Sequence, residues 1–255
     1  MEVHVLASGS KGNVTYIKSS GTRFFVDVGI RINKIKEKLN KEAIDLNQID
    51  TVFITHEHSD HIIGLKGLLA LKTIKQVYLT NGTLKGLPDD VLELLPETII
   101  IQADQTYWIG DLKINVVASS HDANEPVGYI FEEDDKKIVY LTDTGYIDVS
   151  YHELMKGANL YILEANHDPN ILMKSTRPFH LKQRIIGITG HLSNDDAAIF
   201  INKVVAEKAI WVVAHISEDC NNILAIEKAI VNQLDDPTKV TCHYTSQESL
   251  EKIKL

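Results

Sequence analysis

The sequence is poor in cysteine and lacks long apolar runs. Its 255 residues include only two cysteines, Cys220 and Cys242, whose spacing suggests neither a disulfide framework nor a zinc ribbon. No apolar stretch approaches the roughly 18 residues that a membrane span needs. The opening MEVHVLASGSKGN also lacks the basic and apolar regions of a secretory signal. These absences predict a protein of the reducing cytoplasm that has no membrane segment.

Basic charge is scarce as well. The 26 lysines and arginines are outnumbered by 35 aspartates and glutamates, which gives a formal net charge of −9. Nucleic-acid-binding proteins usually carry a basic surface, so this balance taken alone disfavours such a protein. Bound divalent metals would offset part of the negative charge, however, and an acidic chain can still carry a local basic patch.

The order of apolar patterns predicts an α/β fold. Strand-rich stretches with one helix are followed by more strands and then by alternating helices and strands, which predicts a four-layer α/β/β/α sandwich. Without an internal repeat or linker, residues 1–255 are expected to form one domain. Strands are predicted over 3–7, 15–18, 22–28, 51–55, 77–80, 99–102, 112–119, 127–132, 137–142, 160–163, 209–214 and 239–244. Helices are predicted over 32–40 and 62–74 and near 151–157, 194–208 and 223–234.

One short segment concentrates metal-competent side chains. Residues 55–61 read THEHSDH and follow a buried strand. At the end of an extended segment, His56 and His58 point to the same side. Asp60 and His61 follow where the chain turns into a helix. Such a density is hard to explain as packing, and imidazole with carboxylate suits zinc, manganese or iron.

Three further strands end in a metal-competent residue. His121, Asp143 and His215 each follow an apolar run. Strand ends are where α/β folds collect ligands and catalytic groups. Each of these three residues alone is a weak signal. Together with the THEHSDH segment, however, they predict a metal site.

This order of residues, HxHxDH followed by a single His, Asp and His, resembles the metallo-β-lactamase superfamily over nearly the whole chain. Asp27-Val28-Gly29 resembles that family's early Asp-x-Gly element, whose aspartate is usually a structural residue beneath the site. The resemblance implies two divalent metals, which the ligand types allow to be manganese, zinc or iron, with Asp143 bridging them. It assigns one metal to His56, His58, His121 and Asp143, and the other to Asp60, His61, Asp143 and His215.

Finer motifs resemble the bacterial YycJ (WalJ) family and, more distantly, RNase Z. They are SGSKGN at 8–13, SHDA at 120–123, EANHD at 164–168, GHLSN at 190–194 and AHISEDCNN at 214–222. The resemblance implies a DNA exonuclease that acts from the 5′ end, with single-stranded DNA ends as its partner. It also implies that Glu164 and His191 form a dyad beside the metals. No large insertion separates Asp143 from His215, unlike in the larger RNase J-type nucleases.

Two metals suit phosphodiester hydrolysis. Metals roughly 3.5–4 Å apart can share a hydroxide and clamp phosphate oxygens. Asp60 is therefore expected to serve catalysis as well as metal binding. His191, tuned by Glu164, is the candidate general acid for the leaving oxygen. The alternative for His191 is a plain role at the start of the following helix.

Substrate-binding residues are predicted less firmly. Ser10, Lys11 and Asn13 belong to a small polar turn whose amides could meet a phosphate, although a plain turn is an equal alternative. His167 and Asp168 lie beside Glu164 and could line the pocket or simply form a loop. Arg184, with His180 and Lys182, could form a basic patch in FHLKQRI or only a solvated helix face.

Three other functions remain open from the sequence. The same site could activate water against a carbonyl, as in a thioester hydrolase of the glyoxalase II kind, or process RNA. The chain could also be a metal-binding regulatory protein without turnover. A complete ligand set disfavours the last hypothesis, because a scaffold needs no open two-metal site.

Overall fold

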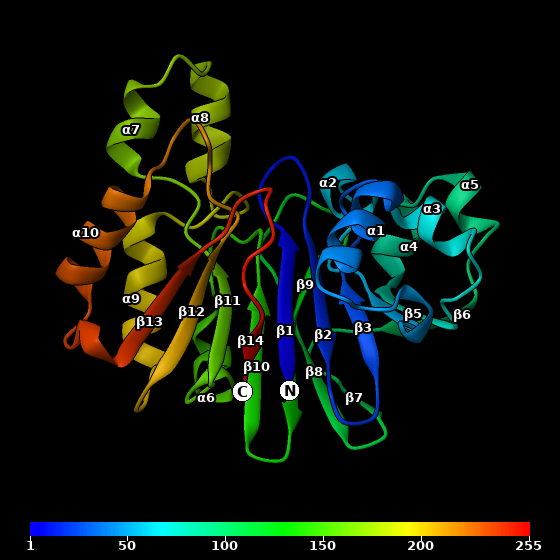
Figure 1. Ribbon diagram of the computed structural model, residues 1–255. Helices are drawn as coiled ribbons and strands as arrows, with labels where there is room; N and C mark the ends of the chain where they lie inside the picture. Colours follow the sequence, from blue (N-terminus) through cyan, green and yellow to red (C-terminus); the bar gives the residue numbers. More distant parts are fainter.

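Two seven-stranded sheets face each other in the computed structural model, which describes residues 1–255 (Figure 1). The first sheet has the order β14-β1-β2-β3-β4-β5-β6, antiparallel from β14 to β3 and parallel from β3 to β6. Its strands are β1 (Glu2–Ala7), β2 (Val14–Lys18), β3 (Arg23–Val26), β4 (Thr51–Phe53), β5 (Gln76–Thr80), β6 (Glu97–Ile101) and β14 (Ile253–Lys254).

The second sheet repeats this plan in the order β13-β12-β11-β10-β9-β8-β7. Its strands are parallel from β13 to β10 and antiparallel from β10 to β7. The strands are β7 (Thr106–Ile109), β8 (Leu112–Ala118), β9 (Val127–Glu133), β10 (Lys136–Leu141), β11 (Leu160–Glu164), β12 (Ala209–Ala214) and β13 (Val240–Tyr244).

Helices cover the outer face of each sheet, which confirms the predicted α/β/β/α sandwich. The first sheet carries α1 (Ile32–Lys41), α2 (Ser59–Ile62), α3 (Leu65–Leu69), α4 (Asn81–Gly86) and α5 (Asp89–Leu92). The second carries α6 (His152–Met155), α9 (Asn194–Val204) and α10 (Ile223–Gln233), while α7 (Pro169–Lys174) and α8 (Phe179–Ile186) stand above its edge (Figure 1). Short 3-10 helices are η1 (Leu46–Gln48), η2 (Val149–Tyr151) and η3 (Pro237–Lys239).

Apolar side chains fill the spaces between these layers. Aromatic rings dominate between the sheets, where the ring centroids of Phe24 and Phe131 lie 4.9 Å apart. The parallel strands β11 and β12 read almost continuously apolar because both of their faces are buried. Trp211 sits fully buried on β12 and donates from Nε1 to the Leu163 carbonyl at 3.1 Å.

Of the helix predicted over 62–74, Ile62 ends α2 and only Leu65–Leu69 forms a further helix, α3, because tertiary hydrogen bonds interrupt the chain before it. The Asp60 carbonyl accepts from the Asn13 amide at 2.8 Å, and the Gly64 amide donates to Val28 at 2.8 Å. A Cβ on Gly64 would stand 2.0 Å from the Ile30 carbonyl, so only glycine permits this approach. The chain therefore forms α2 and α3 as two short pieces.

Other boundaries differ from the predictions as well. The helix predicted over 194–208 ends at Val204, and that near 151–157 is mostly one turn of α6 after η2. The predictions missed α4, α5, α7, α8, β7 and β14, which are short and lack a long apolar period. None of the helices has the length and apolar composition that crossing a membrane would need.

Candidate metal centre

The candidate ligands gather at one edge of the two sheets. They follow the carboxyl ends of β4, β8, β10 and β12, as parallel strands predict. Asp143 and His215 have positive φ angles of 56° and 50°, in the left-handed region that few non-glycine residues adopt. This conformation costs roughly 1–3 kcal/mol and is typical of functional sites.

Three histidines form the first cluster. Ligand atoms of His56, His58 and His121 all lie within 4.8 Å of one another. His56 Nε2 and His58 Nδ1 face each other at 3.0 Å. The sequence predicted that His56 and His58, which follow β4, point to the same side. In the structure their rings lie together with the ring of His121.

A second cluster lies beside the first. Its members are Asp60, His61 and His215, whose ligand atoms also lie within 4.8 Å of one another. Asp60 Oδ2 is 3.7 Å from His61 Nε2 and 3.6 Å from His215 Nε2. One carboxylate and two imidazoles therefore converge on a single point.

Asp143 lies between the two clusters. Its Oδ2 is 3.2 Å from His61 Nε2, and its Oδ1 is 3.3 Å from His215 Nε2 and 4.0 Å from His121 Nε2. One side chain thus reaches both clusters, as a bridging ligand would require.

The cluster fits divalent cations by three observations. Asp143 Oδ2 and His215 Nε2 are buried without a hydrogen-bond partner, which is costly unless something else binds them. Burial and the neighbouring His61 ring hold the pKa of His56 well below its ordinary value, and burial also lowers the pKa of His121. These rings are therefore neutral near pH 7, the form that binds metal. Nitrogen and oxygen donors suit manganese, zinc or iron.

Buried residues beneath the site orient these ligands. Asp27, at the end of β3, accepts from the Thr55 amide at 2.8 Å and meets His61 Nδ1 at 2.8 Å. That carboxylate fixes the ring so that Nε2 faces the cluster. His215 is held by Asn166, whose Nδ2 donates to the His215 carbonyl at 2.8 Å. Asn166 has no predicted role from the sequence, although it lies within the EANHD motif.

Glu164 and His191 form a pair at the wall of the site. His191 Nδ1 lies 2.9 Å from Glu164 Oε2, and Glu164 is completely buried. Burial disfavours the charged form of His191, but the carboxylates of Glu164 and Asp143 outweigh it and raise its pKa to about 9. Two bound cations would add positive charge nearby and lower this pKa. His191 is also close enough to His121 and Asp143 to join a metal-ligand group.

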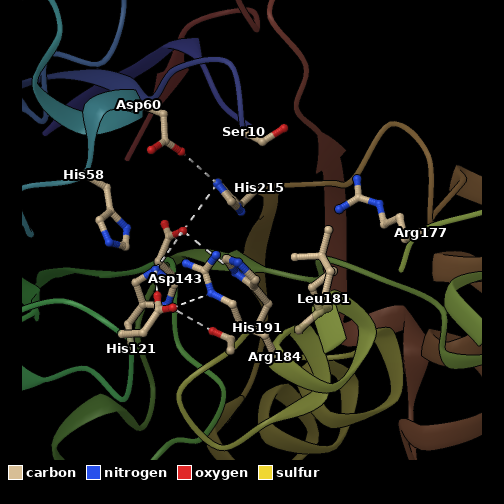
Figure 2. Close-up of a pocket in the computed structure, with 13 residues that line it drawn as sticks. Ser10, His58, Asp60, His121, Asp143, Arg177, Leu181, Arg184, His191 and His215 are labelled. Carbon is tan, nitrogen blue, oxygen red and sulfur yellow. Dashed lines mark hydrogen bonds and ion pairs between the residues drawn. The ribbon is translucent and has the colours of Figure 1, made fainter. Parts of the chain in front are cut away.

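A cavity of about 260 Å³ opens over the cluster (Figure 2). One side presents His58 and Asp60, while Arg177 and Leu181 stand on the opposite side. Arg184 also lines it and is paired with Asp122. The remaining lining residues are Ser10, His121, Asp143, Ile185, Gly190, His191 and His215.

The polar turn after β1 contributes only Ser10 to this cavity. Lys11 points elsewhere and forms an ion pair with Glu218 at 2.5 Å. Asn13 is buried, where its Oδ1 accepts from the Gly9 amide and its Nδ2 faces His61 Nε2 at 3.1 Å. Neither side chain lines the cavity, and Asn13 instead stabilises the turn through its bond with Gly9.

His167 and Asp168 also lie outside the cavity. His167 is fully buried, and burial lowers its pKa to about 4. Asp168 caps α7, with its Oδ1 accepting from the Ile171 amide at 2.8 Å. The loop after β11 turns these side chains away from the metal cluster.

The predicted basic patch has a different composition. Lys182 is buried and donates to the carbonyls of Met173 and Ser175, so it stabilises the α7–α8 hairpin. Arg184 does face the cavity, and its companion is Arg177 rather than a neighbour on α8. Arg177 carried no pattern of its own in the sequence, because only the turn between α7 and α8 brings it to the site.

Similarity to known proteins shows which structural class this chain belongs to. A family model described as a β-lactamase superfamily domain matches residues 22–216. The crystal structure of the metallo-β-lactamase fold protein YhfI from Bacillus subtilis superimposes with a TM-score of 0.73 and 17% identity, over 98% of this chain and 99% of that one. At this identity the likeness shows the fold alone. The chain is a metallo-β-lactamase-fold, metal-dependent hydrolase.

Curated relatives then narrow the family. The exodeoxyribonuclease YycJ of Bacillus anthracis is 35% identical over 234 residues, which cover 90% of this chain and 87% of the relative. The ribonuclease Z of Haloarcula marismortui is 29% identical over 108 residues, which cover 35% of this chain and 32% of the relative. This chain belongs to the YycJ family, as its motifs predicted, and resembles ribonuclease Z more distantly.

Proposed function

We propose that this protein is a metal-dependent DNA exonuclease that degrades single strands from the 5′ end. The main support is one observation: seven candidate ligands converge in a single cluster beside the His191–Glu164 pair. The 35% identity to an exodeoxyribonuclease supports DNA as the substrate. Cys220 and Cys242 are unpaired, which supports the cytoplasmic setting expected from the sequence.

The chain would hold two divalent cations, manganese, zinc or iron. His56, His58 and His121 would bind one and Asp60, His61 and His215 the other, with Asp143 shared. When bound, such cations would lower the pKa of water towards neutrality and stabilise negative charge on a phosphate. Asp60 therefore serves catalysis through its place at the second cation.

The cavity walls would position the substrate and move a proton. Arg177 and Arg184 line the cavity, where their guanidinium groups suit contact with phosphate oxygens. His191 would donate a proton to the leaving 3′ oxygen, and Glu164 would hold its ring through the 2.9 Å contact with Nδ1. Ser10 at the rim could donate a hydrogen bond to a further phosphate.

A thioester hydrolase remains the alternative enzyme. A thiolate leaves without a proton, so such an enzyme would need neither His191 nor two cationic side chains at the cavity wall. Both features favour a phosphodiester, whose alkoxide leaving group is poor. RNA is a second possible substrate, because ribonuclease Z matches about a third of the chain.

Degradation of end-labelled single-stranded DNA tests the proposal. Purified protein would be incubated with 5′-labelled and 3′-labelled strands, with added manganese or with chelator, beside an Asp143→Ala variant. Manganese-dependent release of the 5′ label as mononucleotide first, absent in the variant, is the expected result. Cleavage of a parallel RNA strand alone would replace DNA as the substrate. Failure on both nucleic acids with turnover of a thioester would favour the alternative enzyme.

A further inference from the structure

The cavity over the metal cluster continues into a second hollow. Ser10 lines both, and the second hollow has a volume of about 370 Å³. Its walls are mainly hydroxyl, amide and backbone groups from three loops, those after β1, β12 and β13. Its other polar lining residues include Ser217, Asn222, Ser246 and Gln247, together with Glu218, whose carboxylate is paired with Lys11.

A third hollow of about 300 Å³ follows the second, and Gln247 lines both. Hydrogen bonds fix Gln247 between the β1–β2 loop and α1. Its Nε2 donates to the Gly12 carbonyl at 3.2 Å, and Lys38 Nζ donates to its carbonyl at 2.7 Å. Figure 1 shows the segment before β14, in red, beside the blue β1–β2 loop. The three hollows thus adjoin one another in a row from the metal cluster to α1, and this row is called the line below.

Helix α1 carries a stripe of positive charge along this line. Arg31, Lys34, Lys38 and Lys41 are spaced 3, 4 and 3 residues apart, which places them on one side of the helix. Ile35 and Leu39 occupy the buried side, and the Lys38 stem is buried beside them with its Nζ on the Gln247 carbonyl.

Two carboxylates accompany the four cations. Glu37 is shared between Lys34 at 3.3 Å and Lys41 at 3.1 Å, and Glu248 is 3.8 Å from Lys38. Lys34 and Lys41 remain about two-thirds exposed. The stripe therefore keeps a positive surplus on a chain whose formal net charge is −9.

The α7–α8 hairpin forms one wall of the metal cavity. Arg177, Leu181 and Arg184 come from this hairpin, and Arg177 also pairs with Asp219 of the loop after β12 at 3.1 Å. A polynucleotide whose scissile phosphate reaches the metal cluster is blocked at this wall and can continue past Ser10, which lines both the cavity and the second hollow.

We propose that this line is the track that holds the uncleaved part of the substrate strand. The α1 track consists of Ser10, Gln247 and the stripe of Arg31, Lys34, Lys38 and Lys41. Hydroxyl and amide groups near the metal cluster position the sugar–phosphate chain, and the lysines bind its phosphates by charge. This inference rests on the proposed nuclease function. According to this proposal, α1, which supplies no metal ligand, provides affinity for long strands.

Binding of oligothymidylates of different lengths tests the track. Lys34→Gln/Lys41→Gln would be compared with Lys208→Gln/Lys254→Gln, which removes the same charge at the opposite edge of the sheets. Both pairs are made in the His191→Gln background, which should keep the metals bound and cut the strand only slowly. Fluorescence anisotropy gives Kd for a dinucleotide and for a strand long enough to reach α1, over a range of salt concentrations.

The α1 pair should weaken binding of the long strand roughly tenfold at low salt. Each lost contact with a single strand lowers the salt slope of log K by about 0.7, so the slope should fall by about 1.4. The control pair should match its parent. Equal weakening by the two pairs, or equal weakening for dinucleotide and long strand, would overturn the track. Failure of the nuclease proposal is separate, because it appears as absent cleavage by the wild-type protein.

Discussion

Asp143 combines burial, an unfavourable backbone conformation and contacts with both ligand clusters. It is almost fully buried, adopts a left-handed backbone, and directs its two oxygens at histidines from both clusters. A carboxylate in this place compensates two positive ions at once. Its removal leaves facing imidazoles without a negative charge between them.

Asp143→Ala should therefore lose both metals. Elemental analysis of purified protein is expected to fall from two bound divalent ions to well below one. Asp111→Ala, at an exposed turn between β7 and β8, is the matched control and should keep the wild-type content. Wild-type metal content in Asp143→Ala would contradict the bridging assignment.

His191→Gln should slow DNA cleavage by roughly 100-fold, because the leaving 3′ oxygen loses its proton donor. Metal content should be unchanged. A p-nitrophenyl phosphodiester provides the control substrate, since its leaving group needs no proton and its rate should fall much less. Equal losses on both substrates, or lost metal, would instead identify His191 as a ligand.

At the scale of elements, the site depends on contacts that join strands and helices. Asp27 at the end of β3 holds Thr55 after β4 and His61 in α2. Gly29 lets the Asp60 carbonyl approach, because a Cβ there would lie 1.7 Å from it. The short helix α2 is thus positioned by neighbouring loops rather than by its own length.

Asp27→Asn should weaken metal binding roughly 10–100-fold, as loss of a partner beneath a ligand usually does. The amide nitrogen would present a donor to His61 Nδ1–H and turn or repel the ring. Competition with a chelator of known affinity measures the change. Asp111→Asn serves as the control, and unchanged affinity in Asp27→Asn would mean that packing alone orients His61.

At the scale of the whole molecule, both sheets contribute to one site and one core. Aromatic residues of the two sheets pack against each other, including Phe53 and Tyr129 at 5.3 Å. His56–His61 follows the first sheet, whereas His121, Asp143 and His215 follow the second. The active cluster therefore exists only when the two halves are packed together.

The proposed single domain predicts one unfolding transition. In metal-free protein, circular dichroism reports both sheets, and tryptophan fluorescence reports the second sheet, which carries exposed Trp108 on β7 and buried Trp211 on β12. Their urea midpoints should coincide, because neither half can bury its inner face alone. Two separated midpoints would instead indicate two domains.

The sequence alone determined the layered fold and the seven candidate ligands, and its resemblance to RNase Z implied the Glu164–His191 pair. Strand ends gather at one sheet edge for any α/β chain, so polar residues after apolar runs can be identified without coordinates. The tertiary structure decided what local patterns cannot encode. It buried Asn13 and His167, divided the helix over 62–74, and brought Arg177 to the cavity through a hairpin. These outcomes depend on hydrogen bonds and packing between segments far apart in the chain, which no local period or spacing records.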